Sequence, residues 1–518
     1  MFIDFRTVNN GKTITSDLCI IGAGAAGITI ARELTKGKQR VCIVESGGFD
    51  FSPETQALYD GENIGLPYFD LNTCRLRFLG GTTNHWNGQC APLSQMDFET
   101  RTWVPHSGWP ISKADLDPYY LKALPVCQIG PDTFDARAWM NWGIEPPSFN
   151  PEKIQSHFWQ NSPPTNFGQV YREELKSAEN ITVLLHANVT HIRTDDSGET
   201  VTHVDIGALN GKRGQVLAKV FILACGGIEN PRLLLISNHV HPEGLGNKYD
   251  LVGRFFMDHP TAVCGRAEIA NVDYVLDTFT SKIFEGIRYR PGLKIGEEEQ
   301  RRKQVLNICA TFQSESHPAI ETGKQLLDTL KEGEIPEDLG EKIRIVMNDL
   351  DDVAEYAACR LKGEGKCTTI INLRTRQEQA PNPQSRVSLS QELDALGIPR
   401  LRLDWRFTEL ERKSLKAMAV TLGSEFGRLN LGRVQLPAWL ANDGDPEWIS
   451  GSYHHMGTTR MADSPKNGVV NKDCKVHGTK NLYVAGSSVF PTSGFANPTL
   501  TLVALALRLA DHLSIART

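Results

Sequence analysis

Two polar residues near the end of the chain, His454 and Asn497, are of types that could do proton chemistry. An imidazole has a pKa close to neutral and can take up a proton, while an amide both donates and accepts hydrogen bonds. We expect these two side chains to face a common ligand from opposite ends of the segment 453–513. The alternative is that this segment is a buried closing helix with an ordinary cap.

The elements around Asn497 are expected to be a strand, a loop and a helix. Residues 481–485 form a short apolar run, and residues 486–497 are polar and rich in Gly, Ser and Pro. Pro498 then opens a long apolar stretch, and proline is tolerated there because the N–H that it lacks would be unpaired in a first helical turn. A helix start carries partial positive charge and free N–H groups, so these elements make a cradle for an electron-rich group.

The order strand, glycines, helix also occurs twice earlier in the chain. Residues 17–21 (DLCII) lead into GAGAAG, a helical pattern follows, and a second apolar run, 41–44, ends at Glu45. Residues 220–224 (VFILA) lead into a further glycine pair and another helical pattern. A glycine-rich turn between a strand and a helix, with an acidic residue about 20 positions later, is the fingerprint of a dinucleotide site.

Each glycine of the first turn has its own expected role. Gly22 makes the tight turn, Gly24 lets the backbone approach a pyrophosphate, and Gly27 lets helix and strand pack closely. Glu45 stands where a carboxylate accepts a hydrogen bond from a ribose hydroxyl, which fits FAD or NAD better than NADP.

Composition limits the class of protein. The 518 residues are 40% hydrophobic with a net charge of −6, which is typical of an enzyme of more than one folding unit and gives no basic face for nucleic acid. No run of about 18 apolar residues predicts a membrane span, and the first residues match neither a Sec nor a twin-arginine signal. The 11 cysteines lack metal-binding and haem-attachment spacing, and several lie in apolar runs, so we expect no metal and a reducing, cytoplasmic location.

A second candidate site is the loop 75–93, RLRFLGGTTNHWNGQCAPL. Its Gly80, Gly81 and Gly88 allow a ligand to approach the backbone closely. His85 stands between Asn84 and a tryptophan in this loop, although a single loop histidine is commonly just a polar surface or capping residue.

These motifs together resemble the glucose–methanol–choline (GMC) family of flavin oxidoreductases. The resemblance rests on the fingerprint and on GGTTNHWNG, CGGIENPRLLL, GRFFMDHP, YHHMGTTRM and NLYVAGSSVFPTSGFANPTLT, which occur in the family's order from end to end of the chain. The sequence is most similar to the branch that holds pyranose 2-oxidase and the flavin subunits of fructose and gluconate dehydrogenases.

The resemblance implies an α/β fold (α+β overall) and a set of site residues. It implies a Rossmann-like FAD-binding domain and a second, substrate-binding domain on a mostly antiparallel sheet. His454 matches the catalytic base rather than its neighbour His455, and Asn497 matches its partner. His85 matches a histidine that is joined covalently to the flavin. The covalent members of the branch carry other residues where this chain has Asn84. The implied cofactor-binding residues are Gly22, Gly24, Gly27, Glu45, Gly80, Gly81, Thr82, His85, Trp86, Asn87, Gly88, Val189, Gly226, Gly486, Asn497, Pro498 and Thr499.

The domain organisation follows from the same alignment of motifs. We expect three stretches to form the FAD-binding domain, 1–95, 171–260 and 451–518. Residues 96–170 are expected to form a substrate-side cover, with irregular loops over 132–164, and residues 261–450 the substrate-binding domain, with solvated helices over 322–363.

The expected reaction is oxidation of a primary or secondary hydroxyl of a sugar, glycoside or polyol to a carbonyl. A base takes the hydroxyl proton while a hydride leaves for the flavin N5. Oxygen or another acceptor would reoxidise the flavin, any cytochrome partner would be a separate chain, and a homo-oligomer is compatible with the sequence. Candidate residues for substrate choice are Asn307, Gln313, Glu378 and Gln379.

Two alternative functions remain open. The first is oxidation of a simple alcohol, a choline-like cation or a sterol, and the second is a lyase or binding protein that keeps FAD without redox chemistry.

Overall fold

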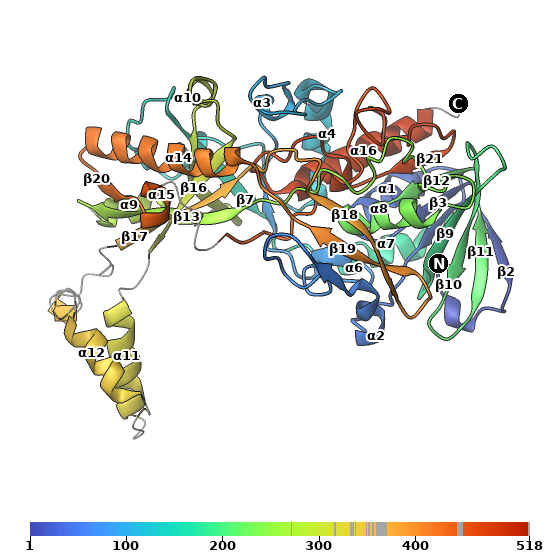
Figure 1. Cartoon of the computed structure of the whole chain (residues 1–518), viewed down its shortest axis with the longest axis horizontal. Helices are drawn as coiled ribbons and strands as arrows, with labels where there is room; N and C mark the ends of the chain where they lie inside the picture. The colour runs from blue at the N-terminus through green and yellow to red at the C-terminus, as the bar shows by residue number, and fades with distance from the viewer. Residues whose placement is uncertain are drawn as a thin grey trace.

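The computed structural model describes residues 1–270, 272–314, 318–331, 336, 338–348, 350, 353–354, 357–358, 370–442 and 449–515. Figure 1 shows two parts side by side, one around a parallel sheet near both chain termini and one around an antiparallel sheet. A helical hairpin of α11 (Pro318–Lys331) and α12 (Leu339–Asn348) projects from the second part.

The first part is built on a six-stranded parallel sheet whose strands come from distant parts of the chain. Its order is β1 (Phe2–Asp4), β8 (Ile181–Leu185), β4 (Val41–Val44), β3 (Leu18–Ile21), β12 (Val220–Leu223) and β21 (Leu482–Val484). All residues of the four strands β3, β4, β12 and β21 are buried, as in a parallel sheet covered on both faces. This arrangement matches the expected Rossmann-like architecture.

Helices from both ends of the chain pack beside this sheet. α1 (Ala25–Glu33) follows β3 and contacts α16 (Pro498–Ile515), which in turn packs against α4 (Lys113–Val126). A capping box of Ser112 and Asp115 starts α4. No described helix is long and apolar enough to cross a membrane.

Two smaller sheets flank the parallel sheet. One has the order β2 (Lys12–Thr15), β11 (Arg213–Leu217), β10 (Val201–Gly207), β9 (Asn188–Thr194), and the other β18 (Arg386–Leu393), β19 (Pro399–Asp404), β5 (Gly61–Asn63). The chain turns at Ala218 and Lys219, so that β11 and the following strand β12 belong to two different sheets. The backbone N–H groups of Lys219 and Val220 both donate to the Asp17 carbonyl, a long-range contact that carries no local sequence signal.

The second part contains an antiparallel sheet. Its order is β20 (Gly432–Gln435), β13 (Thr261–Ile269), β17 (Ile370–Gln377), β16 (Ile308–Ser314), β15 (Ile287–Ile295), β7 (Ile154–Asn161), β6 (Gln89–Cys90), with β14 (Lys282–Phe284) paired to β15. Apolar side chains such as Leu373 and Phe312 pack with α14 (Glu409–Arg428) and α9 (Val272–Phe279) in a separate core on one face.

The prediction of irregular loops over 132–164 is wrong in part. This stretch supplies α5 (Arg137–Asn141) and the long strand β7, which pairs with β15 along its whole length. β7 is largely buried and its sequence, IQSHFWQN, lacks a simple alternation of apolar and polar residues, so periodicity does not reveal it. The helices expected over 322–363 include α11 and α12, and most of the remaining residues of that range lie outside the described part of the chain.

The remaining helices are short. The α-helices are α2 (Pro53–Gln56), α3 (Gln95–Phe98), α6 (Phe167–Val170), α7 (Arg172–Ser177), α8 (Gly226–Ile236), α10 (Glu297–Lys303) and α15 (Ala438–Ala441). The 3-10 helices are η1 (Phe5–Thr7), η2 (Leu34–Lys36), η3 (Ala57–Tyr59), η4 (Gly81–Asn84) and η5 (Ser487–Val489).

Candidate active site

A cavity of about 760 Å³ lies between the two main sheets. Residues at the carboxyl ends of β3, β4, β12 and β21 line one side, where open α/β sheets bind ligands. Residues of β7, β15, β16 and β17 line the other side. The cavity therefore joins a nucleotide-type site to a face of the antiparallel sheet.

The first glycine turn has the geometry that a dinucleotide fingerprint requires. Gly22 has a φ of +101°, and a Cβ there would lie 2.7 Å from the Ala224 carbonyl oxygen. A Cβ on Gly27 would lie 2.0 Å from the Gly22 carbonyl oxygen, so only glycine lets α1 pack this close to the turn.

Three other glycines face the cavity rather than the protein. A Cβ added to Gly24, Gly226 or Gly486 would meet no protein atom within 4 Å, and all three residues line the cavity. Gly24 and Gly226 stand at the starts of α1 and α8, where free N–H groups and the helix dipole favour an anionic group. The residues present therefore fit the pyrophosphate and ring of a flavin dinucleotide.

Glu45 lines the same side of the cavity and is almost fully buried. Its carboxylate accepts hydrogen bonds from the backbone N–H groups of Ala23 (2.8 Å) and Gly47 (2.9 Å). Burial raises its pKa despite these bonds. A carboxylate has further lone pairs, so Glu45 ties the glycine turn to β4 and can still accept from a ribose hydroxyl.

Val189 also lines this end, beside a buried charge network that the sequence did not reveal. Glu229 pairs with Arg75 (2.9 Å), Arg77 (3.3 Å) and Arg232 (3.3 Å). Although burial opposes the shift, these arginines lower the pKa of Glu229 to about 2. The Glu229 carboxylate is thus ionised, and the three arginines balance its negative charge.

The loop that carries His85 forms one wall of the cavity. Gly80 has a φ of +94°, and η4 follows it. A Cβ on Gly88 would lie 2.6 Å from the Ser162 carbonyl oxygen, so this glycine lets the loop join β7 closely. The Trp86 indole N–H donates to the Thr165 carbonyl (2.9 Å) and holds the loop to the segment after β7.

His85 itself lines the cavity and remains accessible to solvent. Partial burial lowers its pKa, which favours a neutral imidazole at neutral pH. Its neighbour Asn84 donates to the carbonyls of Leu79 (3.1 Å) and Gly81 (2.7 Å), so Asn84 supports the loop and leaves the histidine facing the cavity.

His454 and Asn497 do meet, as the sequence predicts for a common ligand. The Asn497 Nδ2 lies 3.3 Å from the His454 Nε2, and both residues line the cavity. The Arg376 Nη1 donates to the Asn497 Oδ1 (2.5 Å) and to the Gln89 Oε1 (3.0 Å). Because Asn497 accepts from Arg376 through its oxygen, its amide nitrogen is the group that faces His454.

A second histidine, His259, fixes the proton positions on His454. The His259 Nε2 lies 3.3 Å from the Ser493 carbonyl oxygen, which can only accept, so this nitrogen carries the hydrogen. The His259 Nδ1 is then an acceptor and faces the His454 Nδ1 at 2.9 Å. His454 must donate from Nδ1, which leaves a lone pair on its Nε2, next to Asn497.

Both rings are neutral at neutral pH. Burial lowers the pKa of His259 to about 3, with Arg376 as a smaller cause. Burial, His259 and Arg376 lower the pKa of His454 well below its usual value. The arrangement Ser493–His259–His454–Asn497 therefore presents a neutral imidazole nitrogen that can accept a proton at the cavity surface.

The backbone around His454 is held by a buried carboxylate. Asp258 accepts from the backbone N–H groups of Ser452 (3.0 Å), His454 (3.0 Å) and His259 (2.6 Å), and from the Tyr68 hydroxyl (2.5 Å). Tyr453 has a φ of +61°, an uncommon conformation for a non-glycine residue. The carboxylate thus holds a strained turn that carries His454 into the cavity.

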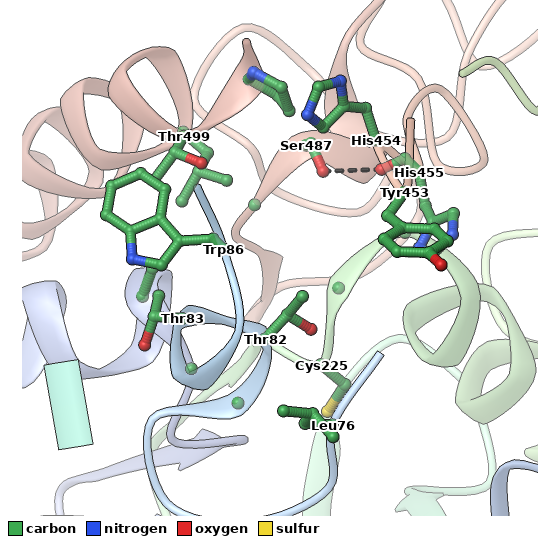
Figure 2. Close-up of a pocket in the computed structure, with 18 of the residues that line it drawn as sticks. Leu76, Thr82, Thr83, Trp86, Cys225, Tyr453, His454, His455, Ser487 and Thr499 are labelled. Carbon is green, nitrogen blue, oxygen red and sulfur yellow. Dashed lines mark hydrogen bonds between the residues drawn. The ribbon is translucent and has the colours of Figure 1, made fainter. Parts of the chain in front are cut away.

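His455 leaves the chain in a different direction from His454 (Figure 2). Its ring packs against those of Tyr68 and Phe256, and its Nε2 is buried with no hydrogen-bond partner in the described part of the chain. The Ser487 hydroxyl donates to its backbone carbonyl (2.7 Å), a bond that ties this turn to η5. Of the two histidines, His454 is the one whose Nε2 lies next to the Asn497 amide.

The prediction that Asn307, Gln313, Glu378 and Gln379 face the substrate is wrong for three of the four residues. Gln313 lines the cavity, but the other three lie behind the sheet edge in a buried layer. Glu378 forms an ion pair with Arg101 (2.5 Å), Asn307 donates to Asp97 (2.9 Å), and the Gln379 amide oxygen accepts from the Asp258 backbone N–H (2.9 Å). They support the site without facing it.

Most of the other residues predicted for the site line the cavity together. Those at its wall are Gly22, Gly24, Glu45, Gly81, Thr82, His85, Trp86, Asn87, Gly88, Val189, Gly226, His454, Gly486, Asn497, Pro498 and Thr499. Gly27 and Gly80 are not among the lining residues. Sequence reasoning missed His259 and the arginines of β15 and β17. The only signal for His259 was its place beside Asp258 in the motif GRFFMDHP.

Known proteins are similar to this chain in sequence or in fold. Residues 381–506 match the family model of the GMC oxidoreductases, C-terminal region. The fructose dehydrogenase large subunit of Gluconobacter japonicus is 23% identical over 97% of this chain and 98% of its own length. The 2-methyl-1,2-propanediol dehydrogenase of Mycolicibacterium austroafricanum is 24% identical over 96% and 95%, respectively. The solved structure of pyridoxine 4-oxidase from Mesorbium loti shares the fold, with a TM-score of 0.57 at 16% identity, over 96% of this chain and 99% of that one.

The fold, the dinucleotide cradle and the histidine–asparagine pair define a flavin-dependent oxidoreductase of CH–OH groups. In its C-terminal sequence and in its fold the chain is similar to GMC oxidoreductases, and the residues of the cavity fit FAD. The matched segment contains His454, Asn497 and the start of α16, so the family match covers the part of the chain that carries the candidate base.

Proposed function

We propose that this protein oxidises a primary or secondary hydroxyl of a sugar, glycoside or polyol to a carbonyl. The observation that carries the proposal is the neutral His454, whose Nε2 lone pair lies 3.3 Å from the Asn497 amide at the cavity surface. The relatives named for fructose and for a propanediol support a polyhydroxylated substrate.

In this proposal, His454 accepts the hydroxyl proton at Nε2. Asn497 donates to the same hydroxyl oxygen and orients the carbon–hydrogen bond, and Arg376 holds the Asn497 amide in the orientation that this needs. FAD supplies the hydride acceptor when it is bound. The N-terminus of α16, at Pro498 and Thr499, adds positive potential at the cavity wall.

We also assign the parts of the chain. Residues 1–95, 171–260 and 451–518 would form the FAD-binding domain, and 261–450 the substrate-binding domain. Residues 96–170 would cover the substrate side, with β7 as a strand of the substrate sheet. The cavity-lining residues named above would hold FAD, and Gly27 would act through close packing of α1.

The test is the flavin absorbance of the purified holoenzyme, mixed without oxygen with sugars, glycosides and simple alcohols and then opened to air. Bleaching by a sugar, glycoside or polyol is the expected result. Rapid recovery of colour in air would identify an oxidase, and slow recovery a dehydrogenase that uses another acceptor. If only a simple alcohol bleaches the flavin, or none of the compounds does, the proposed substrate class is wrong.

We further propose that His85 is joined covalently to the flavin. The bond would link an imidazole nitrogen to the 8α-methyl carbon, with loss of one proton from each and transfer of two electrons to an acceptor such as oxygen. Its support is the accessible, neutral imidazole in the cavity wall. Acid-precipitated wild-type protein should keep its yellow colour and His85→Ala should release it. Colour lost from the wild type would disprove the linkage but not FAD binding.

A further inference from the structure

His259 and His454 form a pair of imidazole rings at and behind the cavity wall. Their Nδ1 atoms lie 2.9 Å apart, and their ring centroids lie 4.9 Å apart at an interplanar angle of 77°. His259 is fully buried, whereas His454 lines the cavity. Two nitrogens at hydrogen-bond distance share one hydrogen, so a proton that arrives on His454 has a direct path to His259.

The hydrogen positions at rest give this path a direction. His454 carries its hydrogen on Nδ1 and has its lone pair on Nε2, which faces the Asn497 amide at 3.3 Å. His259 carries its hydrogen on Nε2, which faces the Ser493 carbonyl oxygen at 3.3 Å, and has its lone pair on Nδ1. A backbone carbonyl accepts hydrogen bonds but does not keep a proton. The path therefore begins at the cavity surface and ends on His259.

The surroundings of the two rings favour a positive charge on His259 over one on His454. Burial and Arg376 lower the pKa of His259, but the backbone carbonyl groups of residues 493 and 494 raise it. Burial lowers the pKa of His454 most, its ionisable neighbours lower it further, and no group in the described chain raises it. The negative charge of a reduced flavin in the cavity favours a protonated pair. The carbonyl dipoles then select the ring that keeps the proton.

Building on the proposed oxidation, we propose that His259 receives the proton of the substrate hydroxyl through His454. The hydroxyl proton moves to the His454 Nε2, and the hydrogen on the His454 Nδ1 moves to the His259 Nδ1. The electron pair of the broken O–H bond stays on oxygen and forms the carbonyl double bond as the hydride leaves the carbon for FAD. His454 thus exchanges one N–H bond for another and ends neutral, while His259 ends as an imidazolium.

This transfer changes what the cavity offers to the product. The His454 Nε2 becomes a hydrogen-bond donor, and it lies beside the Asn497 Nδ2, which is also a donor. Two N–H groups directed at one place stabilise a carbonyl oxygen, as in an oxyanion hole. The positive charge meanwhile lies on His259, a fully buried ring behind the cavity wall. The same imidazole therefore takes the proton from the substrate and binds the product without keeping a charge.

The test locates the proton by long-range ¹H–¹⁵N NMR of the holoenzyme labelled with ¹⁵N-histidine. The flavin is reduced without oxygen, once by the sugar or polyol that bleaches it best and once by dithionite, so that the measurement does not depend on turnover. Neutral and charged imidazoles differ in their nitrogen shifts, and His259→Gln and His454→Gln identify the signals of the pair. His157, another buried histidine whose pKa burial holds well below its usual value, is the internal reference.

We expect the reduced wild type to show His259 as an imidazolium and His454 as a neutral ring with hydrogen on Nε2, while His157 stays neutral. In His259→Gln the amide oxygen still accepts from the His454 Nδ1 but cannot keep a proton. Flavin reduction by the substrate should therefore slow roughly fivefold or more, the difference between a hydrogen bond to a charged group and one to a neutral group. His454 should become the imidazolium in this variant, and His157→Gln, the matched control, should keep the wild-type rate.

The other outcomes separate this proposal from the function on which it rests. A charged His454 beside a neutral His259 in the reduced wild type would overturn the transfer and leave the oxidation intact, and so would two neutral rings. An unchanged rate in His259→Gln, or an equal loss in His157→Gln, would overturn the role of His259 in the rate.

The dithionite arm decides the case in which no hydroxy compound reduces the flavin. If the reduced enzyme then carries the charge on His259, the proton path stands and the proposed substrate class fails. If the charge lies on His454 or on neither ring, both fail.

Discussion

Replacing His259 tests the proposed base most directly. In His259→Leu the His454 Nδ1–H would lose its acceptor, now 2.9 Å away, inside a buried site. An unsatisfied buried donor costs about 1–3 kcal/mol. His454 would then shift to the tautomer with hydrogen on Nε2, which has no lone pair beside Asn497. The same energy corresponds to a loss of about 5- to 150-fold in the rate of flavin reduction.

The assay is anaerobic stopped-flow reduction of the flavin by the compound that bleaches the wild type best. His259→Gln is the comparison variant, because its side-chain oxygen can still accept from His454, and it should retain more of the rate than His259→Leu. FAD content and melting temperature are measured for both variants to exclude loss of structure. A wild-type rate in His259→Leu, or equal losses in the two variants with intact FAD, would refute the assignment of tautomers.

Three further predictions concern pH, glycine packing and the buried layer. Because the pKa of His454 lies well below 6.5, the base stays neutral and the acidic limb of the flavin-reduction profile should fall below pH 6.5; a limb at higher pH would contradict this. Gly24→Ala should fold normally and bind FAD less tightly, because its added methyl group meets only the cavity. Gly27→Ala should be less stable by at least about 2 kcal/mol in denaturant unfolding, because its methyl group would clash with the turn. Equal stability of the two variants would contradict the close packing at the turn. Glu378→Gln should lower the free energy of unfolding by about 3–5 kcal/mol because it strands the buried charge of Arg101, and an unchanged unfolding midpoint would show that this pair contributes little.

The sequence predicts the parts of the fold whose signals are local. The strands near residues 17–21, 41–44 and 481–485 and the helix from Pro498 are present, because short apolar runs bounded by glycine or proline identify buried strands and helix starts. β7 escaped prediction because a largely buried strand has no simple alternation of polar and apolar residues.

In the candidate site, too, the sequence predicts only what has a local signal. His454 and Asn497 could be proposed from their motifs, but the role of His259 depends on which carbonyl its other nitrogen meets, and that is a tertiary contact. The arginines of β15 and β17 look like ordinary solvated positions in the sequence, since a charged residue on a strand usually faces water. Only the packing of the sheet against the nucleotide-binding part turns them inward.

The strand order of the parallel sheet constrains how the protein can fold during its synthesis. β3, with the glycine turn, is made near the start of the chain, but β21 at the sheet edge comes from Leu482–Val484. α16, which packs on α1, emerges from the ribosome later still. The nascent chain therefore carries an incomplete sheet with an unpaired β12 edge until Leu482–Val484 has been made. Until β21 is made, that edge is free to pair with a strand of another chain.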